Sequence, residues 1–225
     1  MFLYNYETGE SKIINFDNDP GNVDYVSLSL NEDKFVIASY SKVSGSYSFE
    51  FWIANIDGTK SKKLETDISI HSFKPQFALN DSVILYKTLK DKNQYVIESF
   101  DLKTIKTKVV FYNGKAKILN FLVSPDGKKI VVHTFSKMEI IDLTNEKNKF
   151  GDNIDIKIHE LLKWSKDGSE VFYKDSENNL WKLKLNPKNG ENACEQVKDK
   201  TGNPIRLRLK TEKIPETFAS GKKSS

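Results

Sequence analysis

The residue types that most often bind transition metals are few in this chain. Three histidines, His71, His133 and His159, and one cysteine, Cys194, are widely separated in the sequence. A metal site needs two or more such ligands brought together with a carboxylate, and the sequence contains no close pair. We therefore expect the histidines to be structural. Cys194 lies in a polar stretch without a neighbouring histidine and has no second cysteine to pair with, so we interpret it as a bystander thiol.

A second group of potential ligands is acidic. Asp17, Asp19 and Asp24 surround a Pro-Gly pair, and oxygen ligands at alternate positions are typical of calcium-binding loops. The Pro-Gly pair interrupts the EF-hand pattern, however, and Asp is common in turns because its side chain bonds the nearby backbone. We therefore interpret this cluster as a turn, and Asp152 and Asp155 in the same way.

Signatures of catalysis and of cofactor binding are missing from the sequence. No Gly-x-Ser-x-Gly elbow occurs, so nothing indicates the nucleophile of an α/β-hydrolase. The 11 glycines fall singly instead of forming a phosphate-binding loop. On these grounds we predict a protein that is not an enzyme and has no catalytic, cofactor-binding or metal-binding residues.

Positive charge is concentrated near the C-terminal end. The formal net charge is +4, but residues 198–225 alone carry a balance of +5, so the rest of the chain is close to neutral. This segment could bind nucleic acid or an anionic surface. Its only aromatic residue is Phe218, however, and it has no apolar face for lipid, so we favour a solvated segment and expect no specific nucleic-acid binding. Its basic residues are Lys198, Lys200, Arg206, Arg208, Lys210, Lys213, Lys222 and Lys223.

The elements that would position any site follow a long repeat. Ser-Pro-Asp-Gly at 124–127 is preceded and followed by apolar runs, and Ser-Lys-Asp-Gly at 165–168 repeats the pattern. Weaker copies begin at Asn31 and Asn80. Pro, Asp and Gly are the residues of tight hairpin turns, and the flanking runs have the length of buried strands.

A second feature repeats with a similar period. Strand-like runs end near Asn55, Asp101, Asp142 and Lys184. Two features that keep the same period indicate units of four antiparallel strands. In the first unit we expect strands at about 23–30, 35–42, 47–56 and 61–66. Trp52, Trp164 and Trp181 lie within expected strands, and we interpret them as packing between units.

The Ser-Pro-Asp-Gly turn, followed by an apolar strand and then a strand closing in Asp-Leu or Asn-Ile-Asp-Gly, resembles the TolB-like (WD-related) repeat. The same repeat occurs in the N-terminal propellers of prolyl oligopeptidase-type peptidases. The resemblance covers roughly residues 1–190 and implies an all-β fold, a β-propeller of four-stranded antiparallel blades. A β-sandwich or barrel of short strands is the alternative.

The repeat divides the chain into about four full blades and a half-blade. The expected blades are 18–66, 67–113, 114–150 and 151–190, and residues 1–17 read as the outer two strands of another blade. Residues 191–225 form a basic C-terminal segment, in which 204–210 alternates apolar and basic residues as a closing edge strand would. A partial propeller, a small closed propeller and a fragment of a longer protein all stay open.

The leading functional hypothesis is a non-enzymatic scaffold that binds another protein, because a propeller presents rigid loops from several blades together. The alternatives are an accessory propeller of a larger prolyl oligopeptidase-type peptidase, and a binder of nucleic acid or of an anionic surface through the basic segment. The N-terminus shows no signal-peptide pattern and no apolar run has the length of a membrane span. The resemblance to TolB implies the bacterial cell envelope or periplasm, whereas a native N-terminus implies the cytoplasm.

Overall fold

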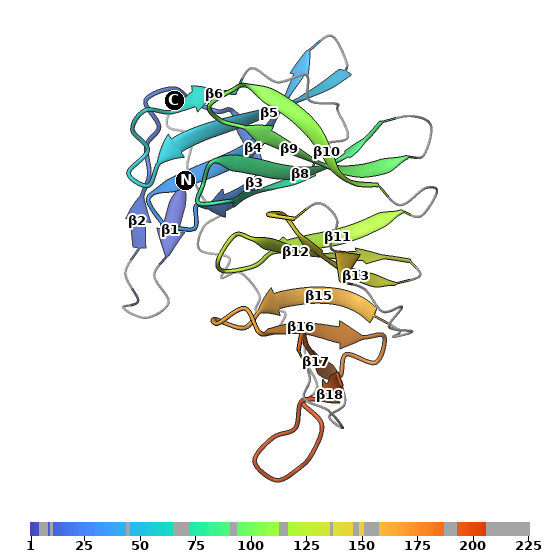
Figure 1. Ribbon diagram of the computed structural model, residues 1–225. Coiled ribbons are helices and arrows are strands. Elements are labelled where there is room, and N and C mark those ends of the chain that lie inside the picture. Colours follow the sequence, from blue (N-terminus) through green and yellow to red (C-terminus); the bar gives the residue numbers. More distant parts are fainter. Residues whose placement is uncertain are drawn as a thin grey trace.

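The structure of the protein is a computed structural model. It describes residues 1–4, 9, 11–43, 46–64, 73–90, 94–112, 117–135, 137–145, 149–150, 158–186 and 193–205. Within these ranges every regular element is a β-strand, and four antiparallel sheets of four strands follow one another along the chain. We name these sheets blades 1 to 4 in chain order (Figure 1).

In each blade the strands occur in the order of the sequence, each paired with the next. Blade 1 contains β3 (Asn22–Leu28), β4 (Lys34–Val43), β5 (Ser46–Asn55) and β6 (Lys62–Lys63). Blade 2 contains β7 (Phe73–Ala78), β8 (Val83–Leu89), β9 (Tyr95–Asp101) and β10 (Lys106–Tyr112). Blade 3 contains β11 (Ile118–Val123), β12 (Lys129–Thr134), β13 (Met138–Asp142) and β14 (Lys149–Phe150). Blade 4 contains β15 (Ile158–Trp164), β16 (Glu170–Asp175), β17 (Leu180–Lys184) and β18 (Cys194–Gln196).

The predicted fold class, an all-β propeller of four-stranded blades, is confirmed by these sheets. The first strands of consecutive blades contact each other: β3 contacts β7, β7 contacts β11, and β11 contacts β15. One layer of buried apolar side chains fills each space between consecutive blades. In the first unit the expected strands agree with β3 to β6 to within a few residues. The predicted domain boundaries stay predictions.

The repeated turn has a common hydrogen-bonding pattern. In blade 3 the Ser124 hydroxyl donates to Asp126 Oδ1 at 2.6 Å and accepts from the Lys129 backbone N–H at 2.9 Å. In blade 4 Ser165 bonds Asp167 Oδ1 and the Glu170 N–H at the same distances. The serine therefore closes the loop at its base, which explains why the turn needs Ser as well as Asp and Gly.

The turn of blade 2 lacks both Pro and Gly and is built differently. Leu79, Asn80 and Asp81 have φ angles of 50°, 55° and 60°, a conformation that is unfavourable for residues with a Cβ. Both neighbouring blades hold this turn in place. Asp81 accepts from the Leu30 N–H of blade 1 at 2.7 Å, and the Leu79 N–H donates to the Gly127 carbonyl of blade 3 at 3.0 Å.

The two ends of the array have different faces. At one end β1 (Phe2–Tyr4) and β2 (Ser11–Ile13) form a two-stranded sheet, and the adjoining Ile14 is buried against Phe35 and Ile37 of blade 1. At the other end, the face of blade 4 turned away from blade 3 carries ion pairs. Their Nζ–O distances are 2.7 Å for Lys174–Glu160, 2.9 Å for Lys182–Glu170 and 2.8 Å for Lys184–Glu195.

The described start of the predicted closing strand lies on blade 4. The Ile205 N–H donates to the Val197 carbonyl and the Leu180 N–H donates to the Ile205 carbonyl, both at 2.9 Å. Pro204 forms an isolated bridge with Lys198. Residues 206–210 lie outside the described part of the chain, so the closing of a ring by this segment stays a prediction.

Candidate functional site: a groove between blades 2 and 3

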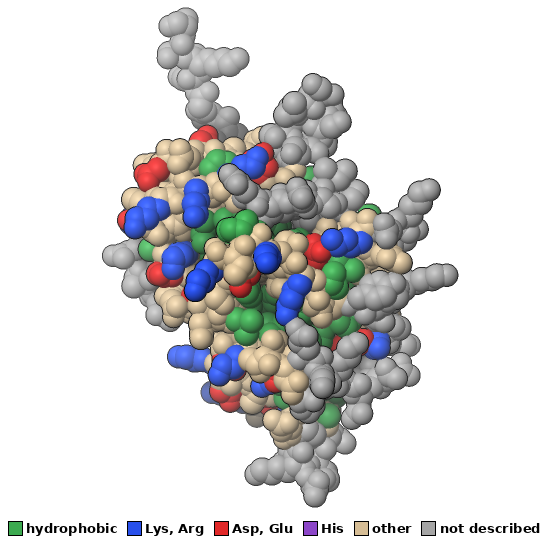
Figure 2. Space-filling view, turned by 45° about the horizontal axis from the view of Figure 1, so that its top comes forward, with side chains coloured by type: hydrophobic (Ala, Val, Ile, Leu, Met, Phe, Trp, Pro, Cys, Tyr) green, Lys and Arg blue, Asp and Glu red, His purple; other side chains and the backbone are tan. Residues whose placement is uncertain are grey.

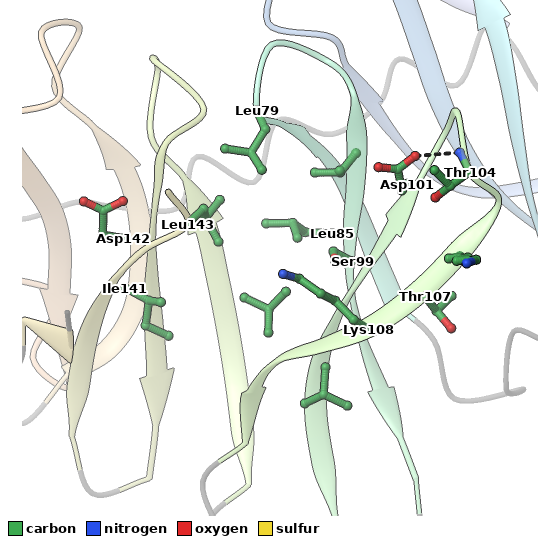
Figure 3. A pocket seen from close by; sticks show the side chains of 14 residues that line it. Leu79, Leu85, Ser99, Asp101, Thr104, Thr107, Lys108, Ile141, Asp142 and Leu143 are labelled. Carbon is green, nitrogen blue, oxygen red and sulfur yellow. Dashed lines mark hydrogen bonds between the residues drawn. The ribbon is translucent and has the colours of Figure 1, made fainter. Parts of the chain in front are cut away.

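A groove with a volume of about 600 Å³ opens between the outer parts of blades 2 and 3 (Figure 3). This volume lies in the range of pockets that hold a ligand or a segment of a partner. Blade 2 supplies most of the lining, and the end of β13 supplies the opposite wall. The lining residues are Leu79, Val83, Leu85, Ser99, Asp101, Thr104, Lys106, Thr107, Lys108, Val109, Val110, Ile141, Asp142 and Leu143.

The described outer strands on the two sides of the groove differ in length. β10 has seven residues, whereas β14 has two and pairs only with Ile140 and Ile141 of β13. The described part of blade 3 therefore does not extend as far outward as blade 2 beside Asp142 and Leu143. The floor of the groove is apolar because Val83 and Leu85 belong to the buried layer between the two blades.

Two lysines of β10 lie on the groove side of blade 2. Lys106 pairs with Asp101, and Lys108 pairs with Ser99. Cross-strand partners share a face, and these partners are in turn opposite Val83 and Leu85, which face blade 3. Figure 3 shows the Lys108 side chain extending from β10 over the apolar floor. Figure 2 shows one face of the molecule, on which hydrophobic side chains gather in the middle and Lys or Arg side chains lie around them.

The two carboxylates of the groove are engaged in turns. Asp101 Oδ1 accepts from the Thr104 N–H at 2.7 Å, and Asp142 Oδ1 accepts from the Thr144 hydroxyl at 2.6 Å and its N–H at 2.8 Å. These hydrogen bonds from the threonines hold the pKa of both carboxyls below the usual range. Carboxylates that stay ionised and bonded to backbone are poor general acids or bases. Both carboxylates therefore have a structural role in their turns.

Blades 2 and 3 also bring together a group of lysines from separate parts of the chain. Lys87 and Lys117 both lie over the ring of Tyr95, with Nζ 5.5 Å and 5.7 Å from its centre. Burial, followed by the charges of Lys74 and Lys117, lowers the pKa of Lys87. Sequence analysis did not find this group because its members come from distant positions and nothing in their spacing relates them.

Two of the histidines lie in neighbouring blades, His133 on β12 of blade 3 and His159 on β15 of blade 4. Their structural role stays a prediction. Burial, and then the charge of His159, lowers the pKa of His133. His71 lies outside the described residues. Within the described ranges, no three His, Cys, Asp or Glu side chains come together in a way that could hold a metal ion.

The acidic cluster near residue 20 makes turn contacts. Asp19 Oδ1 accepts from the Gly21 N–H at 2.9 Å, and Asp17 Oδ2 accepts from the Lys60 N–H at 2.7 Å. The Asp19 contact lies within a turn, whereas the Asp17 contact connects the segment after β2 to blade 1. Asp24 lies within β3, so the interpretation of the whole cluster as a turn does not hold for this residue. Asp152 and Asp155 lie outside the described residues.

Cys194 does not lie in a loop. It begins β18, pairs with Leu183, and packs against the layer between blades 3 and 4. The prediction of a polar loop was wrong because charged neighbours such as Glu195 point to the opposite face, where they form ion pairs. Burial raises the pKa of the Cys194 thiol, which makes it less nucleophilic at neutral pH.

The tryptophans serve packing and hydrogen bonding within the array. Trp164 donates its Nε1–H to the Leu122 carbonyl of blade 3 at 3.2 Å and so connects two blades. Trp181 donates to Asp175 Oδ2 at 2.9 Å within blade 4. Trp52 packs in the apolar cluster between blade 1 and the N-terminal hairpin. The basic side chains beyond residue 205 lie outside the described part of the chain.

Taken together, the sheets and their stacking define a fold of β-propeller blades. TolB from Acinetobacter baumannii is similar to this chain with a TM-score of 0.59 and 19% identity; the match covers 82% of this chain and 45% of TolB. A crystal structure of a nidogen/laminin complex matches with a TM-score of 0.60 and 11% identity, over 82% of this chain and 67% of that one. A prolyl endopeptidase matches with a TM-score of 0.58 and 13% identity, over 87% of this chain and 32% of that one.

These similarities confirm the propeller fold. The chain spans less than half the length of TolB. No protein-family model matches the sequence, and no curated protein matches it either. In the part of the chain that the structure describes, no helix is long and apolar enough to cross a membrane.

Proposed function

We propose that this protein is a non-enzymatic propeller scaffold that binds another protein, and that the groove between blades 2 and 3 is its binding site. The observation that supports the proposal is the combination in the groove of an apolar floor, a volume of about 600 Å³ and a rim of lysines. Apolar centres with polar rims are typical of surfaces that bind proteins. Both carboxylates of the described lining are hydrogen-bonded to turns, which supports a role in binding.

The cell envelope is the proposed setting, since the fold resembles TolB. A second candidate function rests on the similarity to a prolyl endopeptidase, of which the matched region is about a third. In that case the chain is an accessory propeller, and its partner is a peptidase domain. Binding through the basic segment 198–225 stays a separate prediction. If it is correct, the protein binds an anionic surface, and this binding weakens as the salt concentration rises and is lost when residues 198–225 are deleted.

The test of the proposed site begins with affinity capture on the purified protein and identification of a partner. The partner is then purified, and its affinity is measured for the wild-type protein and two variants. Leu143→Lys places a charge in the groove. Leu28→Lys makes the same change at an apolar residue of blade 1 that is 41% exposed.

We expect Leu143→Lys to weaken binding by at least tenfold and Leu28→Lys to leave it unchanged. Burying an unpaired ammonium in an apolar contact costs at least ~1.4 kcal/mol, which is a factor of about ten in affinity. Thermal unfolding of both variants checks that they are folded. Equal affinities of all three proteins would refute the groove as the site, and failure of any purified partner to bind would refute the scaffold function.

A further inference from the structure

Three lysines gather at the end of the layer between blades 2 and 3 where β7 and β11 begin. Lys74 lies on β7, Lys87 near the end of β8, and Lys117 directly before β11. Nζ of Lys87 and Nζ of Lys117 lie 5.5 Å and 5.7 Å from the centre of the Tyr95 ring, which packs against the apolar layer. The charges of Lys74 and Lys117 both act on Lys87. The three ammonium groups therefore form one lysine cluster.

A bulge in β7 sets the position of Lys74. The register of β7 with β8 shifts between Phe73 and Gln76, so the two residues between them have no partner across the strands. Lys74 is the first of these, and its φ angle of 53° is unfavourable for a residue with a Cβ. Bulges re-aim side chains and are common beside functional sites, where strained backbone is also concentrated. The chain thus keeps a strained lysine at the position that completes the cluster.

Lys74 and Lys117 contact neutral groups. Lys74 Nζ donates to Asn120 Oδ1 at 3.5 Å, and Lys117 lies over the Tyr95 ring. Among the described residues, no carboxylate forms an ion pair with either lysine.

Lys87 lies between these two charges and has partners of its own, among them the Ile118 carbonyl at 3.4 Å. Burial, and then the charges of Lys74 and Lys117, nevertheless lower its pKa. A lowered pKa means that burial and repulsion outweigh whatever attraction its ammonium group experiences. Groups perturbed in this way by specific neighbours are candidates for a functional site. The cluster is therefore a place where a bound anion would relieve repulsion.

We propose that Lys74 and Lys117 hold a phosphoryl group, with Lys87 beside it. Both outer lysines are exposed, so the anion reaches them from solvent. A phosphoryl group carries about two negative charges at neutral pH, which matches one lysine from each blade, whereas a carboxylate carries one. Lysine binds phosphate as a point charge and needs no planar geometry. None of these lysines lines the groove, so the inference goes beyond the scaffold function.

The probe is inorganic phosphate, and its binding is measured as a rise in Tm, because a ligand that binds only the folded protein stabilises it. Ionic strength is held constant with sodium chloride. Acetate replaces phosphate in a second arm, and glycerol 3-phosphate in a third. The wild-type protein is compared with Lys74→Gln/Lys117→Gln. The matched control is Lys103→Gln/Lys128→Gln, which removes two exposed lysines from turns at the opposite end of the same blades.

We expect phosphate to raise the Tm of the wild-type protein and of the control variant alike, and acetate to have no effect. Lys74→Gln alone should weaken phosphate binding by about tenfold, since one charge-assisted hydrogen bond is lost. The double variant should not respond. Phosphate should also shift the amide NMR signals of Ile118 and Asn120. Binding of glycerol 3-phosphate would assign the site to esterified phosphoryl groups, and binding of phosphate alone would assign it to the free anion.

Three results would overturn the proposal: no effect of phosphate on the Tm, an equal effect of acetate, or equal responses of the two double variants. The Tm of each variant without phosphate shows that it is folded. Failure of this inference is separable from failure of the scaffold function, because the latter is tested by the affinity of a purified partner for Leu143→Lys.

Discussion

Gly127 occupies the point where three blades meet, and its replacement by alanine gives the most direct test of the array. Its φ angle is +69°, and its carbonyl accepts the Leu79 N–H of blade 2. A Cβ at this position would overlap Cδ1 of Leu30 from blade 1 and lie 3.0 Å from the Leu79 nitrogen. The substitution therefore perturbs contacts with both neighbouring turns at once.

Two effects add in the expected loss of stability. A left-handed conformation costs a residue with a Cβ ~1–2 kcal/mol, and overpacking of a closely packed site costs ~1–3 kcal/mol. Gly168 is the matched control, because it has the same place in the repeat and a φ angle of +71°, but its nearest contact would be Pro125 Cδ at 3.7 Å. We expect Gly127→Ala to lose about 3 kcal/mol and Gly168→Ala about 1 kcal/mol, the latter from conformation alone.

The assay is urea unfolding followed by tryptophan fluorescence, with thermal unfolding as a second measure. Each kcal/mol by which the overlap destabilises Gly127→Ala relative to Gly168→Ala should lower its Tm by about 2–4 °C. Adding Leu30→Ala to Gly127→Ala removes the overlapping atom, so the double variant should lose less than the sum of the two single variants. Equal losses for Gly127→Ala and Gly168→Ala, or strict additivity with Leu30→Ala, would show that the turns of blades 1 and 3 do not pack as described.

Three further predictions concern single side chains. Gln76 donates to the Phe121 carbonyl and accepts from the Val123 N–H of β11, at 3.1 Å in each case. Gln76→Leu leaves both backbone groups unsatisfied and should lower the free energy of unfolding in urea by about 1–3 kcal/mol. No loss would mean that water replaces these hydrogen bonds. Glu98 is buried and accepts from the Tyr86 hydroxyl at 3.1 Å and from Lys90 Nζ at 2.7 Å. Glu98→Ala should therefore lower the free energy of unfolding by about 3 kcal/mol, and Tyr86→Phe by about 1 kcal/mol. A larger loss for Tyr86→Phe would contradict this assignment. Hydrogen bonds from Ser165 and Ser169 lower the pKa of Asp167 to about 2. Because the pKa of Asp167 is lower in the folded than in the unfolded protein, its carboxylate stabilises the fold above the unfolded pKa, and this stabilisation disappears as the pH falls from about 4 to about 2. The free energy of unfolding of Asp167→Asn should therefore depend less on pH in this range. An unchanged dependence on pH would refute the role of this carboxylate.

The strands and turns were predictable because their signals are local. Alternating apolar residues and the Ser-Asp-Gly turns identified four units, and the strongest copies at 124–127 and 165–168 have closely similar hydrogen bonds in the structure. Blade 2 gave the weakest signal because its turn uses three left-handed residues, which neighbouring blades hold in place. A conformation that depends on distant partners leaves little trace in the local sequence.

The candidate site was not predictable in the same way. Lys106 and Lys108 of β10 and Leu143, which follows β13, line one groove although they belong to different blades. The proximity of His133 and His159 likewise depends on the stacking of two blades. The spacing of residue types in the sequence predicts contacts within a hairpin, whereas contacts between sheets depend on how their apolar faces pack.

The sequence by itself determined the all-β class, the four-stranded repeat and the turn at the head of each unit. These follow from period, turn chemistry and apolar patterning, which act over a few residues. Only the tertiary structure decided where the groove lies, because its lining residues come from two blades that pack side by side. It also decided which charges face each other, as the Lys–Glu pairs of blade 4 show, because their members come from different strands of the sheet.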